Sequence, residues 1–221
     1  MNHFPETRCT RIKVCGITRL EDAVHAATLG VDALGFVFYP ASPRYIEPGA
    51  AATIIRQLPP FVSVVGLFVN AGQGEIDAVL DVCPLDILQM HGDESPDFCA
   101  AQTRRVIKAV AVHEAADTAR IADFDCTVLL DAKAPSGVYG GTGNAFDWKL
   151  VEELEHAHPL ILAGGLHAEN VATALAVRHW DALDVSSGVE ISPGIKDGEK
   201  LQRFMAAVHG SAHYAGNGVV D

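Results

Sequence analysis

Short apolar segments alternate with longer amphipathic segments along almost the whole chain, and this alternation limits the possible fold more than any other feature. Most apolar segments lack strict polar–apolar alternation, which is typical of strands buried on both faces of a parallel sheet. The predicted strands are Arg11–Cys15, Ala33–Phe38, Ser63–Phe68, Ile87–Met90, Val106–Val110, Thr127–Asp131, Leu160–Ala163 and Ala182–Ser186. The predicted helices are Leu20–Leu29, Pro48–Leu58, Glu75–Val82, Pro96–Thr103, Ala115–Ala122, Trp148–His156, Asn170–Val177 and Gly198–Val208. Each predicted strand is thus followed by a predicted helix.

This order predicts an α/β fold that consists of a single (β/α)8 TIM barrel. A length of 221 residues fits such a barrel. A doubly wound open sheet has the same alternation, but it needs only about five or six strands and no G-x-G-x-x-G motif follows the first strand. We therefore expect a short polar extension at residues 1–10, one barrel domain at 11–208 and a flexible tail at 209–221.

The charge balance excludes some classes of partner. The net charge is −12, from 16 Lys and Arg against 28 Asp and Glu, whereas nucleic-acid and anionic-membrane binders carry clustered positive charge. We therefore expect no nucleic-acid partner and no membrane partner. A small anionic substrate remains compatible, because it needs only a local positive potential.

The cysteines point to a reducing compartment. The chain has 5 of them, widely scattered and without a C-x-x-C pair, so neither a disulfide framework nor a structural zinc site is indicated. The first ten residues contain no apolar signal core. We therefore expect a cytoplasmic protein. We also expect that it needs neither a metal nor a cofactor, because no group of His, Cys and Asp residues has metal-ligand spacing.

The carboxyl ends of the last two predicted strands favour a phosphate site, since barrel active sites lie at that face. These strands end at Gly164-Gly165 and at Ser186-Ser187-Gly188. In barrels the loops after strands seven and eight often bind phosphate together with the start of a short extra helix. Glycine lets the backbone approach an anion closely. The same glycines are also common in ordinary turns.

Other strand ends carry reactive or charged side chains. Cys15 closes the first strand and Asp131 follows an apolar run, where a carboxylate must be paired, hydrogen-bonded or protonated. Arg44 follows the second strand and is suited to binding a carboxylate or phosphate, although a lone loop arginine is usually solvated. Gln89 and His91 follow the fourth, where His91 either shapes the pocket or lies on a polar rim. A buried cysteine is more often an inert small hydrophobe.

A glycine-rich stretch, Gly140–Gly143, follows the sixth predicted strand. Such a loop either closes over the barrel mouth as a lid or is an ordinary connection. The sequence leaves both interpretations open.

Several motifs, in this order, resemble the N-(5′-phosphoribosyl)anthranilate isomerase family of tryptophan biosynthesis. They are Lys13–Thr18, Gly35–Tyr39 with Ser42–Tyr45, Gln89–Glu94, Leu130-Asp131, Gly140–Gly143 with Phe146–Trp148, Ala163–Leu166 and Asp184–Glu190. The resemblance covers about residues 11–208. Met90 stands where leucine is common, which does not affect the chemistry.

The resemblance implies a catalytic pair and a set of binding residues. Cys15 matches the general base, Asp131 the general acid and Arg44 the arginine that binds the anthranilate carboxylate. The expected substrate-binding residues are Arg44, Gln89, His91, Gly164, Gly165, Ser186, Ser187 and Gly188. The implied enzyme acts on a small anionic phosphorylated substrate and is a monomer or a homodimer.

The implied reaction is an Amadori rearrangement of N-(5′-phosphoribosyl)anthranilate to 1-(2-carboxyphenylamino)-1-deoxyribulose 5-phosphate. Asp131 would protonate the ribose ring oxygen, and Cys15 would remove the proton from the second carbon of the sugar. A thiol with a pKa of about 8.5 is only a few per cent thiolate at neutral pH. Either that fraction suffices, or a local positive potential lowers the pKa of Cys15.

Two other functions are compatible with parts of the pattern. Another sugar-phosphate barrel enzyme, such as ribulose-phosphate epimerase or indoleglycerol-phosphate synthase, would need metal-binding histidines and aspartates or a lysine acid at the strand ends. Lys13 lies inside the first predicted strand and not at its end. A non-catalytic barrel that binds a phosphorylated metabolite would keep the loops at Gly164 and Ser187 but would need neither Cys15 nor Asp131.

Overall fold

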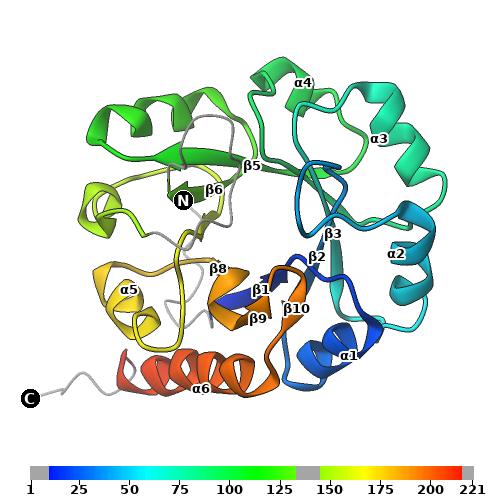
Figure 1. Ribbon diagram of the computed structural model, residues 1–221. Helices are drawn as coiled ribbons and strands as arrows, with labels where there is room; N and C mark the ends of the chain where they lie inside the picture. Colours follow the sequence, from blue (N-terminus) through cyan, green and yellow to red (C-terminus); the bar gives the residue numbers. More distant parts are fainter. Residues whose placement is uncertain (1–9, 133–144, 216–221) are drawn as a thin grey trace, which may run out of the picture.

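The computed structural model describes residues 10–132 and 145–215, with side chains through residue 211. Within these residues, eight parallel strands form a closed barrel in chain order (Figure 1). The strands are β1 (Arg11–Cys15), β2 (Ala33–Val37), β3 (Ser63–Phe68), β4 (Ile87–Met90), β5 (Arg105–Val112), β6 (Thr127–Ala132), β7 (Leu160–Leu162) and β8 (Ala182–Val185). β8 pairs with β1 in parallel register, which closes the sheet. The predicted single (β/α)8 barrel is confirmed.

Helices lie outside the ring of strands (Figure 1). The α-helices are α1 (Leu20–Thr28), α2 (Pro48–Ile55), α3 (Gln73–Leu80), α4 (Pro96–Ala100), α5 (Val171–Val177) and α6 (Gly198–Ala215). Three segments are 3₁₀ turns, namely η1 (Ala115–Asp123), η2 (Trp148–Val151) and η3 (Ser187–Val189). The α-helices predicted at 115–122 and 148–156 are thus 3₁₀ segments, and the second is shorter than predicted. Arg178 Nη1 donates to the carbonyl oxygens of Val151 and Leu154 at the end of this segment, where the Val151 carbonyl also accepts from the Leu154 N–H.

The last helix is longer than predicted. The apolar side of this helix ends at Val208, which is the predicted boundary. Its buried residues are Leu201, Phe204, Met205 and Val208. α6 nevertheless continues to Ala215, because extending an existing helix costs far less than starting one. Residues 209–215, expected in a flexible tail, are therefore helical.

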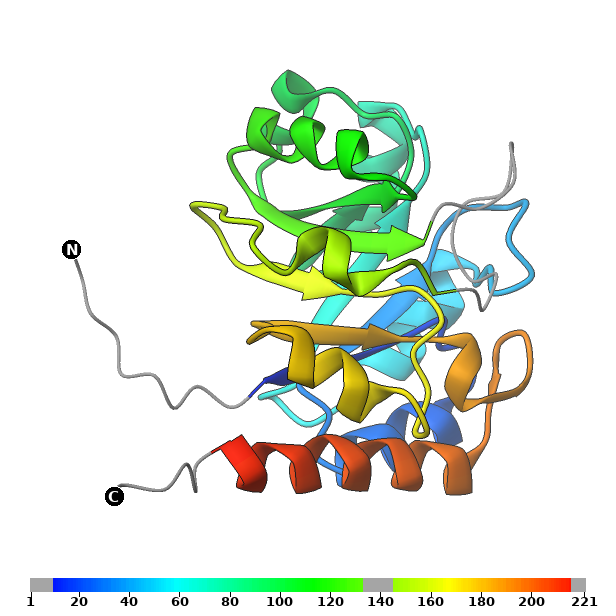
Figure 2. The same ribbon diagram turned by 90° about the vertical axis from the view of Figure 1, so that its left-hand side faces the viewer.

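A small hairpin that was not predicted follows β8. Its antiparallel strands are β9 (Glu190–Ser192) and β10 (Ile195–Lys196). The turn contains Gly194, whose φ of 81° suits glycine. Figure 2 shows the hairpin at the end of the barrel toward which the strand arrows point. The hairpin therefore lies at the face where barrel enzymes have their active sites.

Side chains from alternate strand positions fill the barrel interior. One buried cluster is aliphatic and contains Val65, Ile107, Ala109, Leu129, Ile161 and Ala163. A second cluster, formed by Cys15, Val37, Leu67 and Val69, lies nearer the carboxyl ends of β1 to β3. Cys15 therefore belongs to the layer of the interior that faces the carboxyl-terminal side. No helix in the described segments is long and apolar enough to cross a bilayer.

Candidate functional site

The Cys15 thiol is buried at the end of β1 and lies against β2. Only 6% of Cys15 is exposed. A Cβ atom at Gly35 would come within 2.9 Å of the Cys15 sulfur, so this glycine makes room for the thiol. Directly after Cys15, Gly16 adopts a φ of 80°, and its N–H donates to the Gly35 carbonyl. The predicted base is thus enclosed by backbone on two adjacent strands.

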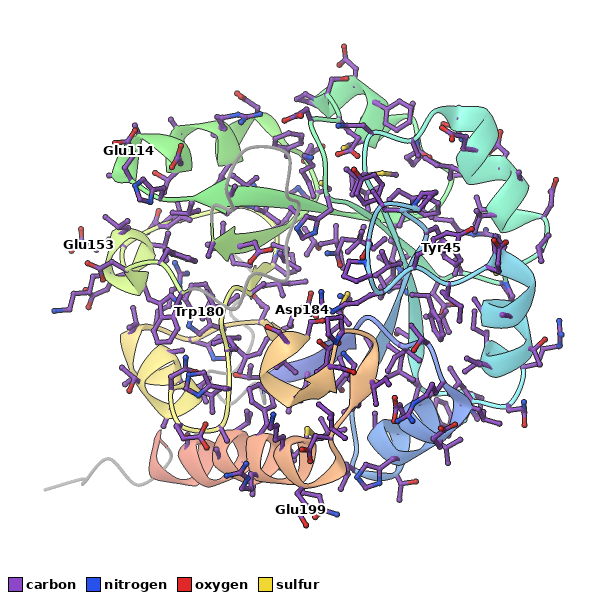
Figure 3. All side chains as sticks on the ribbon, viewed as in Figure 1. Tyr45, Glu114, Glu153, Trp180, Asp184 and Glu199 are labelled. Carbon is purple, nitrogen blue, oxygen red and sulfur yellow. The ribbon has the colours of Figure 1, made fainter. Side chains whose placement is uncertain are left out.

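A buried ion pair lies beside this thiol. Lys13 Nζ is 2.7 Å from Asp184 Oδ2, and both side chains are buried. Figure 3 shows Asp184 near the centre of the ring of strands. Neither Lys13 nor Asp184 was predicted as a site residue. A usable signal was the strand period of two, which places Lys13 on the same side of β1 as Cys15.

The surroundings of Cys15 favour the neutral thiol. Burial raises the pKa of Cys15 above its ordinary value of 9.0, and Asp184 adds to this effect. Lys13 and Lys196 act in the opposite direction without reversing the shift. Of the two possibilities left by the sequence, this environment favours the first, catalysis by a small thiolate fraction. Only a small thiolate fraction is present at neutral pH.

This pKa shift can be measured directly. We expect the Cys15 thiolate to form with a midpoint above pH 9, because burial disfavours its charged form. The measurement is the ultraviolet absorbance of thiolate during a pH titration, taken as wild type minus Cys15→Ser so that the other cysteines cancel. A difference titration with its midpoint below pH 8 would contradict the environment described for Cys15.

Asp131 lies in a hydrogen-bonded chain with two other predicted site residues. Its Oδ1 accepts from the N–H of Ala132 at 2.8 Å, and its Oδ2 is 3.2 Å from His91 Nε2. His91 Nδ1 is 2.9 Å from Gln89 Nε2. With Gln89 Nε2 as the donor to Nδ1, Nε2 is the ring nitrogen of His91 that can donate to Asp131. His91 therefore contacts the predicted acid and is not merely a rim residue.

Gly164 borders the same carboxylate. Its φ is 82°, a conformation that suits glycine. A Cβ at this position would come within 2.9 Å of Asp131 Oδ1 and 2.6 Å of the Ala132 nitrogen. Gly164 is therefore required for the placement of Asp131 as well as for the loop after β7.

The loops after β7 and β8 meet, as the sequence predicted for a phosphate site. A side chain at Gly188 would overlap the carbonyl oxygen of Leu166, so these two loops are in contact. The short helix η3 begins at Ser187, which agrees with the expected extra helix. In the parts of the chain that are described, the N–H groups of Gly165 and Gly188 have no protein acceptor. They are available to an anion.

Two polar side chains fix these loops. Asn170 Nδ2 donates to the Gly165 carbonyl at 2.9 Å, while its Oδ1 accepts from the His167 N–H at 2.9 Å. Asn170 was not predicted as a site residue. Ser186 Oγ donates to the Cys15 carbonyl at 3.0 Å. The Ser186 side chain thus ties β8 to β1 beside the thiol.

Arg44 is not a solvated loop residue. It is 9% exposed and pairs with Glu190, with Nε 3.0 Å from Oε1 and Nη2 2.7 Å from Oε2. A Cβ at Gly16 would come within 2.5 Å of Arg44 Cδ, so the stem of Arg44 crosses the residue that follows Cys15. The interpretation of Arg44 as a buried anion-binding group is therefore favoured over the surface alternative.

Glu190 and Lys196 come from the unpredicted hairpin. Lys196 Nζ donates to Glu190 Oε1 at 2.7 Å and also to the Cys15 carbonyl at 2.5 Å. Both side chains are buried. The P-G pair before Ile195 signalled a turn, but nothing local indicated that the turn would bring Glu190 to Arg44.

Two further points complete the description of the site. The glycine-rich stretch Gly140–Gly143 lies outside the described residues. In residues 10–132 and 145–215, no group of three or more His, Cys, Asp or Glu side chains could hold a metal ion.

Comparison with known proteins places the chain in one family. The family model of N-(5′-phosphoribosyl)anthranilate (PRA) isomerase matches residues 12–207. The isomerase of Acidithiobacillus ferrooxidans is 53% identical over 204 residues, which cover 91% of this chain and 98% of that protein.

Solved structures agree with this match. The crystal structure of the Thermotoga maritima isomerase has a TM-score of 0.86 at 44% identity, and the match covers 91% of this chain and 99% of that one. A PRA isomerase in complex with reduced 1-(o-carboxyphenylamino)-1-deoxyribulose 5-phosphate has a TM-score of 0.81 at 40% identity, with the same coverage. The chain therefore belongs to the N-(5′-phosphoribosyl)anthranilate isomerase family and is an isomerase of tryptophan biosynthesis.

Proposed function

We propose that this chain converts N-(5′-phosphoribosyl)anthranilate into 1-(2-carboxyphenylamino)-1-deoxyribulose 5-phosphate, with Cys15 as general base and Asp131 as general acid. The observation that carries the proposal is the placement of a thiol on β1 and a carboxylate on β6. Both are buried at the carboxyl-terminal face, on strands that are not neighbours in the barrel. The ligand of the related solved complex, a reduced form of the proposed product, supports the choice of substrate.

The first step opens the sugar ring. Asp131 protonates the ring oxygen of the ribose while the bond between that oxygen and the first carbon breaks. The nitrogen lone pair then forms a double bond to the first carbon, which gives an iminium ion. The N–H of Ala132 and the His91 ring lie within hydrogen-bond distance of the Asp131 oxygens, where the new negative charge forms.

The second step moves the double bond. The Cys15 thiolate removes the proton from the second carbon, and the electrons of that bond neutralise the iminium nitrogen to give an enolamine. The enol proton is then lost and the first carbon gains a proton, which leaves the ketone. The net reaction is an isomerisation that consumes no oxidant or reductant. Burial raises the pKa of Cys15, so only a small fraction of the free site carries the thiolate that this step uses.

The two anionic ends of the substrate bind to different parts of the site. The loops that contain Gly164, Gly165, Ser186, Ser187 and Gly188 bind the phosphate, mainly through backbone N–H groups. Arg44 binds the anthranilate carboxylate through the edge of its guanidinium that Glu190 leaves open. Bulk charge plays no part in this, which explains how a chain with net charge −12 takes an anionic substrate.

Replacing Arg44 tests the carboxylate assignment. We expect Arg44→Ala to raise KM for N-(5′-phosphoribosyl)anthranilate by about tenfold or more, because a charged hydrogen-bonded pair with the substrate is lost. The effect on kcat should be smaller. Substrate consumption can be followed by its fluorescence, with thermal unfolding as the check that the variant is folded. An unchanged KM would remove Arg44 from carboxylate binding.

The setting of the enzyme is part of the same proposal. A cytoplasmic location agrees with the free cysteines in the described residues, of which all but Cys126 are buried. The assembly state is a monomer or a homodimer, and one related structure is of monomers generated from the dimeric enzyme of Thermotoga maritima. Sedimentation of the purified chain distinguishes the two states.

A further inference from the structure

Glu190 occupies one edge of the Arg44 guanidinium, and no hydrogen bond from Arg44 Nη1 is found among the residues that the structure describes. Arg44 Nε lies 3.0 Å from Glu190 Oε1 and 3.2 Å from Oε2, and Nη2 lies 2.7 Å from Oε2. A guanidinium has two edges that can each hold a carboxylate in bidentate fashion. With the edge formed by Nε and Nη2 taken, the edge formed by Nη1 and Nη2 is left for a second carboxylate.

Glu190 is itself held firmly. Its Oε1 accepts from Lys196 Nζ at 2.7 Å and from the Gly194 N–H at 3.2 Å, in addition to Arg44. Its backbone carbonyl accepts from Lys200 Nζ at 2.7 Å. Burial would raise the pKa of Glu190, but Arg44 and Lys196 outweigh it and the pKa is lowered, so the group is ionised. A carboxylate with this many donors cannot turn without losing several bonds.

The charges of this cluster are unbalanced in a way that points to an anion. The side chains of Arg44 and Lys196 share one carboxylate partner, Glu190. The other buried carboxylate nearby, Asp22, accepts from the backbone N–H of Lys196 and is paired with Arg19. The neighbouring Lys13 is already balanced by Asp184. Burial lowers the pKa of Lys196, so the positive charge that an anionic ligand would balance is mainly that of Arg44.

We propose that Glu190 is a positioning residue that makes the enzyme specific for an aromatic amine bearing a carboxylate. Glu190 fixes the guanidinium of Arg44 so that its open edge faces the carboxylate of the substrate. This inference rests on the proposed function, because it concerns the same substrate. It assigns the specificity to a residue that the substrate does not touch.

Simple electrostatics predicts the opposite effect of losing Glu190 on the binding of the substrate carboxylate. Removing a negative charge beside Arg44 makes the site more positive, so a charge-only account predicts tighter binding of the carboxylate. Positioning predicts weaker binding, because the freed guanidinium turns away from the ligand and loses bidentate geometry. The direction of the change therefore decides between the two accounts.

The experiment compares two substrates that differ only in the carboxylate. They are N-(5′-phosphoribosyl)anthranilate and N-(5′-phosphoribosyl)aniline, and the measured quantity is the ratio of their kcat/KM values. We expect wild type to prefer the anthranilate compound and Glu190→Gln to reduce that ratio by about tenfold or more, with kcat/KM for the aniline compound little changed. An unchanged or increased ratio in the variant would overturn the proposal.

Two further variants complete the design. Glu190→Asp keeps the negative charge but has a shorter side chain, so it should also reduce the ratio of the kcat/KM values. If Glu190→Gln does not fold, Glu190→Asp is the variant that tests the proposal. A ratio that Glu190→Asp leaves unchanged would also overturn the proposal. Glu199→Gln is the matched control, because Glu199 is exposed on α6 and lies on the outer side of the molecule (Figure 3); its ratio should equal that of wild type.

The same data separate this inference from the proposed function. If wild type turns over neither substrate, the proposed function fails. If wild type turns over and prefers the anthranilate compound while both Glu190 variants keep that preference, only the role of Glu190 fails. A purely structural role would reduce kcat/KM for both substrates together and leave the ratio unchanged.

Discussion

Replacing Cys15 by serine is expected to lower kcat for N-(5′-phosphoribosyl)anthranilate by about a hundredfold or more. Proton removal by a positioned base contributes about 10²- to 10⁴-fold to a rate, and a serine hydroxyl forms far less of its anion than a thiol does. The fold should persist, because serine is no larger than cysteine and the space over Gly35 is unchanged. The measurement is substrate fluorescence during turnover, together with the circular dichroism of the variant.

Cys99 provides a matched control for this substitution. It is also a buried cysteine, 4% exposed, and burial raises its pKa to about 11. It belongs to α4, on the outside of the barrel. Cys99→Ser should therefore keep the wild-type kcat. Turnover close to wild type in Cys15→Ser would end the assignment of Cys15 as the base.

Asp131→Asn should have an effect of similar size. An amide cannot donate its proton as a carboxylic acid does, so ring opening loses its general acid and kcat should fall by about a hundredfold or more. The amide oxygen can still accept from the Ala132 N–H, and the side chain has nearly the same shape. The fold should therefore remain, as thermal unfolding would show.

Asp125 provides the matched control for Asp131→Asn. It lies two residues before the strand that carries Asp131, its side chain is 95% exposed, and it contacts His158. Asp125→Asn should leave kcat unchanged. If Asp131→Asn also turned over at a normal rate, the acid would have to be another group.

The periodicity of the sequence was sufficient to predict the barrel. Strands buried on both faces are continuous apolar runs, and the predicted bounds of Arg11–Cys15, Ser63–Phe68 and Ile87–Met90 match β1, β3 and β4. Helix lengths were less predictable. η2 ends at Val151, beside carbonyl groups that also accept from Arg178, which is distant in sequence, and no local pattern predicts such a contact.

The strand-end rule also located most of the candidate site. Because a barrel brings all its carboxyl strand ends to one face, residues such as Cys15, His91 and Asp131 could be grouped without knowing any distance. The rule cannot find residues that lie in a hairpin beyond the end of a strand. Glu190 pairs with Arg44 across 146 positions of sequence, and that pairing depends on how the β9–β10 hairpin folds back over β1.

The interior pair was missed for a different reason. Lys13 and Asp184 lie within strands, where a charged residue in an apolar run looks like an interruption and not like part of a site. Only the closure of β8 onto β1 brings Lys13 opposite Asp184 in register. Since the register follows from the closed barrel, the ion pair becomes predictable once the closure is known.

The most direct test of the central claim is the turnover of N-(5′-phosphoribosyl)anthranilate by the purified chain without added metal or cofactor. The account predicts rapid loss of substrate fluorescence with formation of the carboxyphenylamino deoxyribulose phosphate, at a rate that Cys15→Ser and Asp131→Asn each reduce by about a hundredfold or more. Folded wild-type protein that consumes the substrate no faster than the uncatalysed reaction would contradict it, and would favour a barrel that only binds a phosphorylated metabolite.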